Sequence, residues 1–375
     1  MTENNEVTKR RQEIKAEIKG GKYRSLARVI LDGTGRIIQR LTFSEKPPSF
    51  WYNSLVFAVV TLLFCTSIAI PQRSLIADLP PEFGLDLVLG GLLAVLFGSS
   101  LVISAALTHN RLLSTLSDSV LDAIQSEDDL NNLCSWLATS FNMKGQLLIS
   151  LVPALVILPL ANIWFSTRTG VKIGIITHIV AIIAGFQALV AVPVVFASFT
   201  MPHRLSNYQL KLFSADPSSS EVIDTLSDTI NGILLTMGIL LAFISVDATL
   251  VIPEATRVFG FVFLAVPWGL LIVVFIGGQY ALAKIINKAK WKTLNGIQAQ
   301  IERLQEQEEI LGEEILGHIN ELLDYHNRIR ATRNSAMDIR AGLSLLQSLL
   351  LPVIGLLLAN LLDVFEILSN LTAGK

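Results

Sequence analysis

Long apolar runs separated by polar connectors dominate the hydrophobic pattern of this chain. A helix needs about 20 residues to cross a bilayer core of ~30 Å. Six runs meet that length: 51–70, 87–107, 146–165, 173–199, 232–252 and 258–283. Trp51, Tyr52, Trp164 and Tyr280 lie at the ends of these runs, where membrane interfaces favour aromatic side chains. The pattern therefore predicts an all-α, polytopic membrane bundle, with residues 51–283 forming a six-span unit.

A seventh apolar run lies near the C-terminus, at Gly342–Leu362. It contains no charged residue, and its polar side chains are Ser344, Gln347, Ser348 and Asn360. A helix lying in the membrane interface would carry a strongly charged face. Residues 342–375 are therefore predicted to form a seventh span and an outer tail.

The charged segment 284–341 shows a heptad pattern. Leu294, Ile301, Ile315, Leu322 and Ile329 share one heptad position, as in a coiled coil. A single straight helix would reach roughly 85 Å from the membrane, too far for re-entry at Gly342. Gly312 lies near the midpoint, so the segment is predicted to fold back as a cytoplasmic antiparallel helical stalk. The alternative is an intermolecular coiled coil in a homo-oligomer, followed by a tail adsorbed to the membrane.

Residues 1–50 form a basic N-terminal segment. Within it, residues 27–43 place two β-prone runs around Asp32-Gly33-Thr34-Gly35, a pattern that predicts a β-hairpin. Residues 1–52 carry eleven Lys and Arg against six Asp and Glu. That excess favours an anionic lipid surface as partner and argues against nucleic acid. The hairpin is either a small surface element or a regulatory, lipid-sensing one.

Two polar connectors within the six-span unit resemble each other. Each opens with a histidine near an Arg-Leu pair, His109 in one and His203 in the other. Each then reaches an acidic helix start, at Ser126-Glu127 or Ser220-Glu221, about 94 residues apart. A duplication of a helical hairpin with its connector would explain the match, although chance similarity is the alternative.

Composition supports the membrane assignment, and charge predicts the orientation of the chain across the membrane. Apolar residues make up 51% of the chain, charged residues 16%, and the mean hydropathy is +0.56. With the N-terminus inside, 24 of the 29 Lys and Arg residues face the cytoplasm, as the positive-inside rule requires. The chain is thus predicted to lie in a cell membrane, of inner-membrane type, with its N-terminus cytoplasmic and its C-terminus outside.

Two ionisable residues lie within the predicted spans, and such residues are costly in lipid unless they are paired or functional. His178 and Asp247 are each six residues from the outer end of a span, ~9 Å below the boundary. Asn162 and Asn360 approach the same level. The four residues predict a polar vestibule opening outward. The alternative is that Asp247 stays solvated while His178 bonds a neighbouring helix. Gln187 and Ser99 are interpreted as helix-packing groups.

No motif identifies a reaction or a cofactor. The chain lacks a GxxxxGK[ST] loop, an HExxH pair and a GxSxG elbow, so no catalytic, cofactor-binding or metal-binding residue is predicted. Three functions remain open: a channel or transport protein whose stalk serves regulation or assembly, a scaffold that recruits a helical protein through its coiled coil, and a secondary transporter using His178 and Asp247. The number of spans favours channel or transport, because an anchor needs only one or two.

Overall fold

The computed structural model describes residues 2–42, 49–69, 81–169, 175–251, 257–306 and 313–336. Regular structure in these ranges is helical, and the only β-type pairing among them is an isolated bridge between Ile124 and Leu210. The helices are α1 (Thr2–Lys19), α2 (Leu26–Thr42), α3 (Phe50–Ala69), α4 (Pro81–Thr115), the π-helical turn η2 (Leu116–Val120), α5 (Leu121–Ala123), α6 (Glu127–Ser140), α7 (Met143–Thr169), α8 (Ile175–Leu205), the 3-10 turn η3 (Pro217–Ser219), α9 (Glu221–Val251), α10 (Arg257–Glu306) and α11 (Glu313–Ala331).

Six stretches of the described chain are helical, long and apolar enough to cross a membrane. Each overlaps one of the six predicted spans, so the chain is an integral, multi-pass membrane protein by length and composition. Several helices continue into the polar connectors: α10, for example, has 50 residues, ~75 Å at 1.5 Å per residue. The predicted seventh span, 342–362, lies outside the described residues.

The predicted β-hairpin at residues 27–43 is wrong, because Leu26–Thr42 forms the helix α2. Its buried residues Ala27 and Leu31 are four apart, a helical spacing. A side chain at Gly35 would collide with the Asn53 amide of α3. That glycine therefore provides room for a neighbouring helix and does not form a turn.

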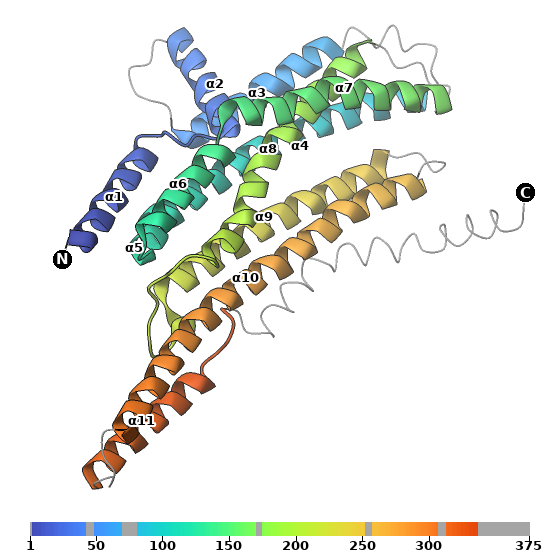
Figure 1. Cartoon of the computed structure of the whole chain (residues 1–375). Coiled ribbons are helices and arrows are strands. Elements are labelled where there is room, and N and C mark those ends of the chain that lie inside the picture. Colours follow the sequence, from blue (N-terminus) through green and yellow to red (C-terminus); the bar gives the residue numbers. More distant parts are fainter. Residues whose placement is uncertain are drawn as a thin grey trace, which may run out of the picture.

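Helices α4 and α8 lie at the centre of the membrane unit. Their mutual contact is the most extensive in the described chain; α7 also packs on α8, α3 and α9 pack on α4, and α10 packs on α9. Figure 1 shows these long helices lying alongside one another, with α1, α5 and α6 gathered near the N-terminus. The outer face of α7 keeps large apolar side chains such as Leu148 and Leu155 exposed, 61% and 50%, as expected of a helix facing lipid.

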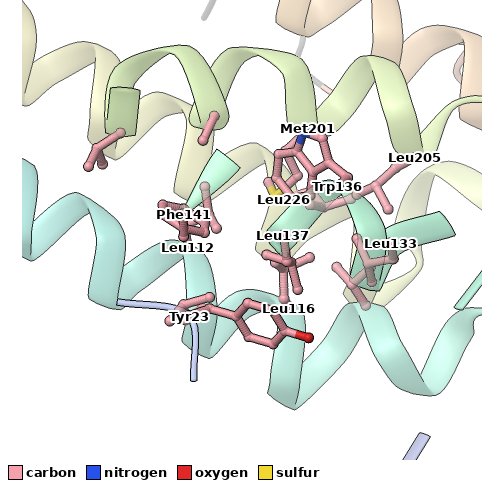
Figure 2. Packing of buried hydrophobic residues seen from close by; sticks show 14 of the residues in the cluster. Tyr23, Leu112, Leu116, Leu133, Trp136, Leu137, Phe141, Met201, Leu205 and Leu226 are labelled. Carbon is pink, nitrogen blue, oxygen red and sulfur yellow. The ribbon is translucent and has the colours of Figure 1, made fainter. Parts of the chain in front are cut away.

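The main apolar core lies where the membrane helices meet a basal layer, defined as residues 2–25, 116–140 and 206–220. Its fully buried side chains include Leu112 of α4, Leu137 of α6 and Met201 of α8. Figure 2 shows Tyr23, from the α1–α2 connection, packed into the same cluster. The two similar connectors meet here, since the Lys211 N–H donates to the Ala123 carbonyl at 2.7 Å.

Helices α10 and α11 form an arm, defined as residues 290–306 and 313–336. A separate apolar cluster, including Leu294, Ile301 and Ile319, joins the two helices. At its base, the Lys290 ammonium donates to the Arg330 and Thr332 carbonyls and to Asn334 Oδ1, each at 2.8 Å. The end of α11 thus lies beside the middle of α10, as Figure 1 also shows. The cytoplasmic position of this arm remains a prediction.

Candidate functional site

The predicted outer vestibule falls largely on residues that the structure leaves undescribed. His178 lies in the first turn of α8 and is half-buried. Asn162 and Asp247 occupy helical positions in α7 and α9, but their side chains are not described, and Asn360 lies outside the described residues. The vestibule is therefore still a prediction, and the described polar groups lie elsewhere.

The central α4–α8 contact contains a buried polar pair. Gln187 of α8 donates from Nε2 to Ser99 Oγ of α4 at 3.3 Å, and both residues are at most 4% exposed. The helices approach closely because Gly98 has no side chain: a Cβ there would lie 2.6 Å from Gln187 Oε1 and 3.1 Å from the Ala184 carbonyl oxygen. This arrangement places an amide between two packed membrane helices.

The Gln187 amide is incompletely hydrogen-bonded. Its Oε1 atom is buried and has no partner among the described residues. Exchanging the oxygen and nitrogen positions of the amide would still leave one of them unpartnered. A buried polar atom in an apolar setting costs free energy unless it finds a partner. The Gln187 amide thus keeps one buried polar atom without a partner in the described chain.

A second group of unpartnered amides lies on α9 and α10. Asn231 Oδ1 and both polar atoms of Gln279 are buried without a hydrogen-bond partner in the described chain. The helices bearing them pack closely here, since a Cβ at Gly278 would lie 3.3 Å from Ile230. A Cβ at Gly277 would likewise lie 3.3 Å from His203 Nε2 of α8. Three membrane helices therefore bring polar groups near one level.

Charged contacts attach helix α1 to residues 116–140 of the basal layer. The Lys15 ammonium lies 2.8 Å from the Asp122 carboxylate, and the Arg11 guanidinium donates to the Ile124 carbonyl at 2.9 Å. After α1, the Tyr23 hydroxyl donates to Glu17 at 2.7 Å. Several basic residues of the N-terminal segment thus have partners within the protein, whereas Arg36 and Arg40 on α2 are exposed.

The Glu17–Tyr23 contact changes the acidity of both groups. Hydrogen bonds from Lys22 and Tyr23 to the carboxylate lower the pKa of Glu17 below its ordinary value. Burial, together with the bond to Glu17, raises the pKa of Tyr23. The ionised carboxylate and the neutral phenol are therefore the forms that hold α1 against the core.

No metal-ligand set is assembled in the part of the chain that the structure describes. No group of three or more His, Cys, Asp or Glu side chains is gathered there, and Cys65 and Cys134 are separate, buried thiols. Of the buried amides, the sequence analysis singles out Gln187 but not Asn231 or Gln279. Counting amides in the apolar runs would find Gln279, in the run 258–283, whereas Asn231 lies one residue before the run 232–252.

Comparison with known proteins identifies no relative. No family model, no curated protein and no solved structure matches the chain. The proposed function therefore rests on the burial, hydrogen bonds and helix contacts of the described residues.

Proposed function

We propose that the protein is a channel or transport protein, and that the α4–α8 contact at Gln187 and Ser99 forms part of its path. The supporting observation is the unpartnered, buried Gln187 oxygen between two helices of the membrane unit. A helix that only anchors a protein gains nothing from such a group, whereas a path for water or small polar solutes needs acceptors at this depth. The unpartnered Asn231 Oδ1 atom and Gln279 amide support the same proposal.

Placement follows the charge distribution. We propose a cell membrane, of inner-membrane type, with residues 1–50 and 284–341 in the cytoplasm and the C-terminus outside. The support is the 24 to 5 division of Lys and Arg between the two sides. In this arrangement the basal layer and the arm face the cytoplasm, where they are available for regulation or assembly.

Flux into liposomes tests the path. The purified protein is reconstituted and assayed for water, glycerol and urea entry by light scattering, and for potassium and proton movement with a pH-sensitive dye. We expect Gln187→Leu to reduce flux severalfold, because it removes the acceptor while keeping a similar volume. Ser150→Ala is the matched control: Ser150 bonds the Gln146 and Leu189 carbonyls and leaves the Gln187 amide unchanged.

Two results would contradict the proposed path. If Gln187→Leu lowers thermal stability and leaves every flux unchanged, the pair serves helix packing. Absence of protein-dependent flux of all five probes in the wild type would reject the proposed path directly.

Self-association through the arm is the second candidate, and a scaffold that recruits a soluble helical protein through the same helices stays a prediction. Leu316 and Leu323 of α11 share one face beside the buried contact with α10 and are 45% and 42% exposed. A second copy of the chain could cover this face, as heptad-bearing helices commonly self-associate. Leu316→Lys with Leu323→Lys should then shift the native mass of the reconstituted protein to that of a monomer. An unchanged mass would reject self-association through α11.

Secondary transport through His178 and Asp247 is a third proposal. Its basis is the sequence, in which both residues lie six positions from the outer end of a predicted span. Asp247→Asn, His178→Gln and the double variant should show non-additive effects on the pH profile of flux if the residues are coupled. Additive effects with an unmoved profile would mean that they act independently.

A further inference from the structure

We propose that a row of lysines on α10 and the hollow beside it bind the headgroup of an anionic phospholipid. Lys284, Lys288 and Lys292 are spaced four residues apart, so they share one face of the helix. Lys284 and Lys292 are the first and last of the three, and they span ~12 Å along the axis.

The row lies where α10 leaves its apolar run. Before Lys284, the residues from Val258 to Ala283 contain no charged side chain, and the exposed Leu270, Val273 and Ile276 form a lipid-compatible surface. Tyr280 lies one turn before the row and Trp291 lies beside Lys288 and Lys292, and they are 69% and 61% exposed. Exposed aromatics beside a cationic row are typical of a membrane interface.

Two hollows adjoin the row and share Lys288. The first, about 360 Å³, is lined by Tyr280, Ala283, Lys284, Asn287, Lys288 and Trp291. The second, about 330 Å³, lies between α10 and the α8–α9 connector, and Tyr208, Leu210, Lys288, Ala289 and Lys292 are among its lining residues. Each is large enough for a phosphate with its substituents. The second has walls from two parts of the chain and is therefore the better headgroup site.

The lysines keep hydrogen-bonding capacity for a phosphate. Lys284 donates to Asn207 Oδ1 at 3.1 Å, and Lys288 donates to the Asn207 and Tyr208 carbonyls at 3.1 and 3.2 Å. An ammonium has three N–H donors, so both retain at least one, while Lys292 forms no hydrogen bond with the described residues. Their partners are neutral oxygens, so the positive charge of the row is not compensated by them.

Surrounding charges reinforce the preference for an anion. Arg204 and Lys211 are exposed on the end of α8 and on the connector. Asp129 and Asp216 are nearby carboxylates: Asp129 accepts a hydrogen bond from the Gln209 N–H at 2.8 Å, and Asp216 interacts electrostatically with Lys290 of α10. The local balance stays positive, which attracts anionic lipid. A phosphate in the second hollow would meet Lys288 and Lys292, and its acyl chains could follow the apolar surface of α10.

Spin-labelled lipids test the proposal with the full chain in bilayers. We would compare the association of labelled phosphatidylglycerol and phosphatidylcholine, the anionic and zwitterionic probes. Replacing Lys284, Lys288 and Lys292 together by Gln should remove most of the preference for phosphatidylglycerol, at about fivefold per lysine near an anionic surface. The matched control replaces the exposed Lys9, Arg303 and Arg328 by Gln, which changes the net charge equally and should preserve the preference.

Two further experiments distinguish a headgroup bound in the hollow from general attraction between the lysines and an anionic surface. Ala289→Phe fills the second hollow without changing charge, and it should also lower the preference. Inorganic phosphate at millimolar concentration should not displace the labelled lipid, because the acyl chains contribute to binding. An unchanged preference in the lysine variant would overturn the site, and so would full retention of it by a folded Ala289→Phe protein. Complete displacement by free phosphate would assign the row to a soluble anion. These readouts are independent of any flux.

Discussion

Two glycines of α2 differ in what their missing side chains permit. A Cβ at Gly33 would meet nothing within 4 Å, whereas one at Gly35 would collide with the buried amide of Asn53. Glycine weakens a helix interior by up to about 1 kcal/mol relative to alanine. The same substitution should therefore have opposite effects two residues apart.

We expect Gly33→Ala to raise the melting temperature and Gly35→Ala to lower it, the latter costing about 1–3 kcal/mol through overpacking. Scanning fluorimetry of the detergent-solubilised protein measures both, with each variant serving as the other's control. Similar changes of the same sign would contradict the packing of α2 on α3.

Glu17 makes the docking of α1 sensitive to acid. Its pKa is lowered in the folded protein, so its stabilising contribution is fully present above its unfolded pKa of 4.5 and is lost as the pH falls through the folded value. The melting-temperature difference between wild type and Glu17→Gln should be constant near neutral pH and disappear in acid. Tyr23→Phe should reduce that difference. A difference independent of pH would exclude the Glu17 carboxylate as its source.

Some residue-scale features could be predicted from the sequence and others could not. Gln187 and Ser99 stand out as polar residues in apolar runs and are interpreted as helix-packing groups, but their contact with each other could not be predicted, because 88 residues separate them. The contact of Lys15 with Asp122 is invisible in the sequence, because 107 residues separate the partners and many other carboxylates were available. His178 and Asp247 remain a prediction, since depth along a helix does not determine which side of the helix a residue occupies.

At the scale of elements, the length of the apolar runs was the reliable signal. A helix is the only open-chain structure that satisfies its own backbone in lipid, so six long runs imply six helices. Short β-branched runs at Val29-Ile30 and Ile37-Ile38 misled the reading of α2. The apolar spacing of three and four residues around Ala27 and Leu31 was the better guide, because burial follows the helical period.

The arm offers a matched pair of positions four residues apart on α11. Ile319 is 6% exposed and belongs to the seam with α10, whereas Leu323 is 42% exposed. Ile319→Ala should destabilise the arm by about 2–5 kcal/mol, and Leu323→Ala by much less. Hydrogen exchange of the amides of α11 provides the measurement. Equal acceleration in both variants would contradict the seam.

At the scale of the whole molecule, the predicted seventh span places the C-terminus outside the cell. In a background with Cys65 and Cys134 replaced by Ser, a cysteine at Ala373 should react with an impermeant maleimide in intact cells, because an uncharged run of about 20 residues crosses a bilayer. A cysteine at Lys9 should react only after lysis. Labelling of position 373 only after lysis would leave six crossings and a cytoplasmic C-terminus.

The three hydrogen bonds from the Lys290 ammonium to oxygens of residues 330–334 allow the length of the arm to vary. These hydrogen bonds hold residue 290 and residues 330–334 together at the base of the arm, and the two helices project from that base. Removing one heptad from each helix would shorten the arm by about 10 Å and would leave the base unchanged. The reach of the arm can therefore be tuned independently of the membrane unit.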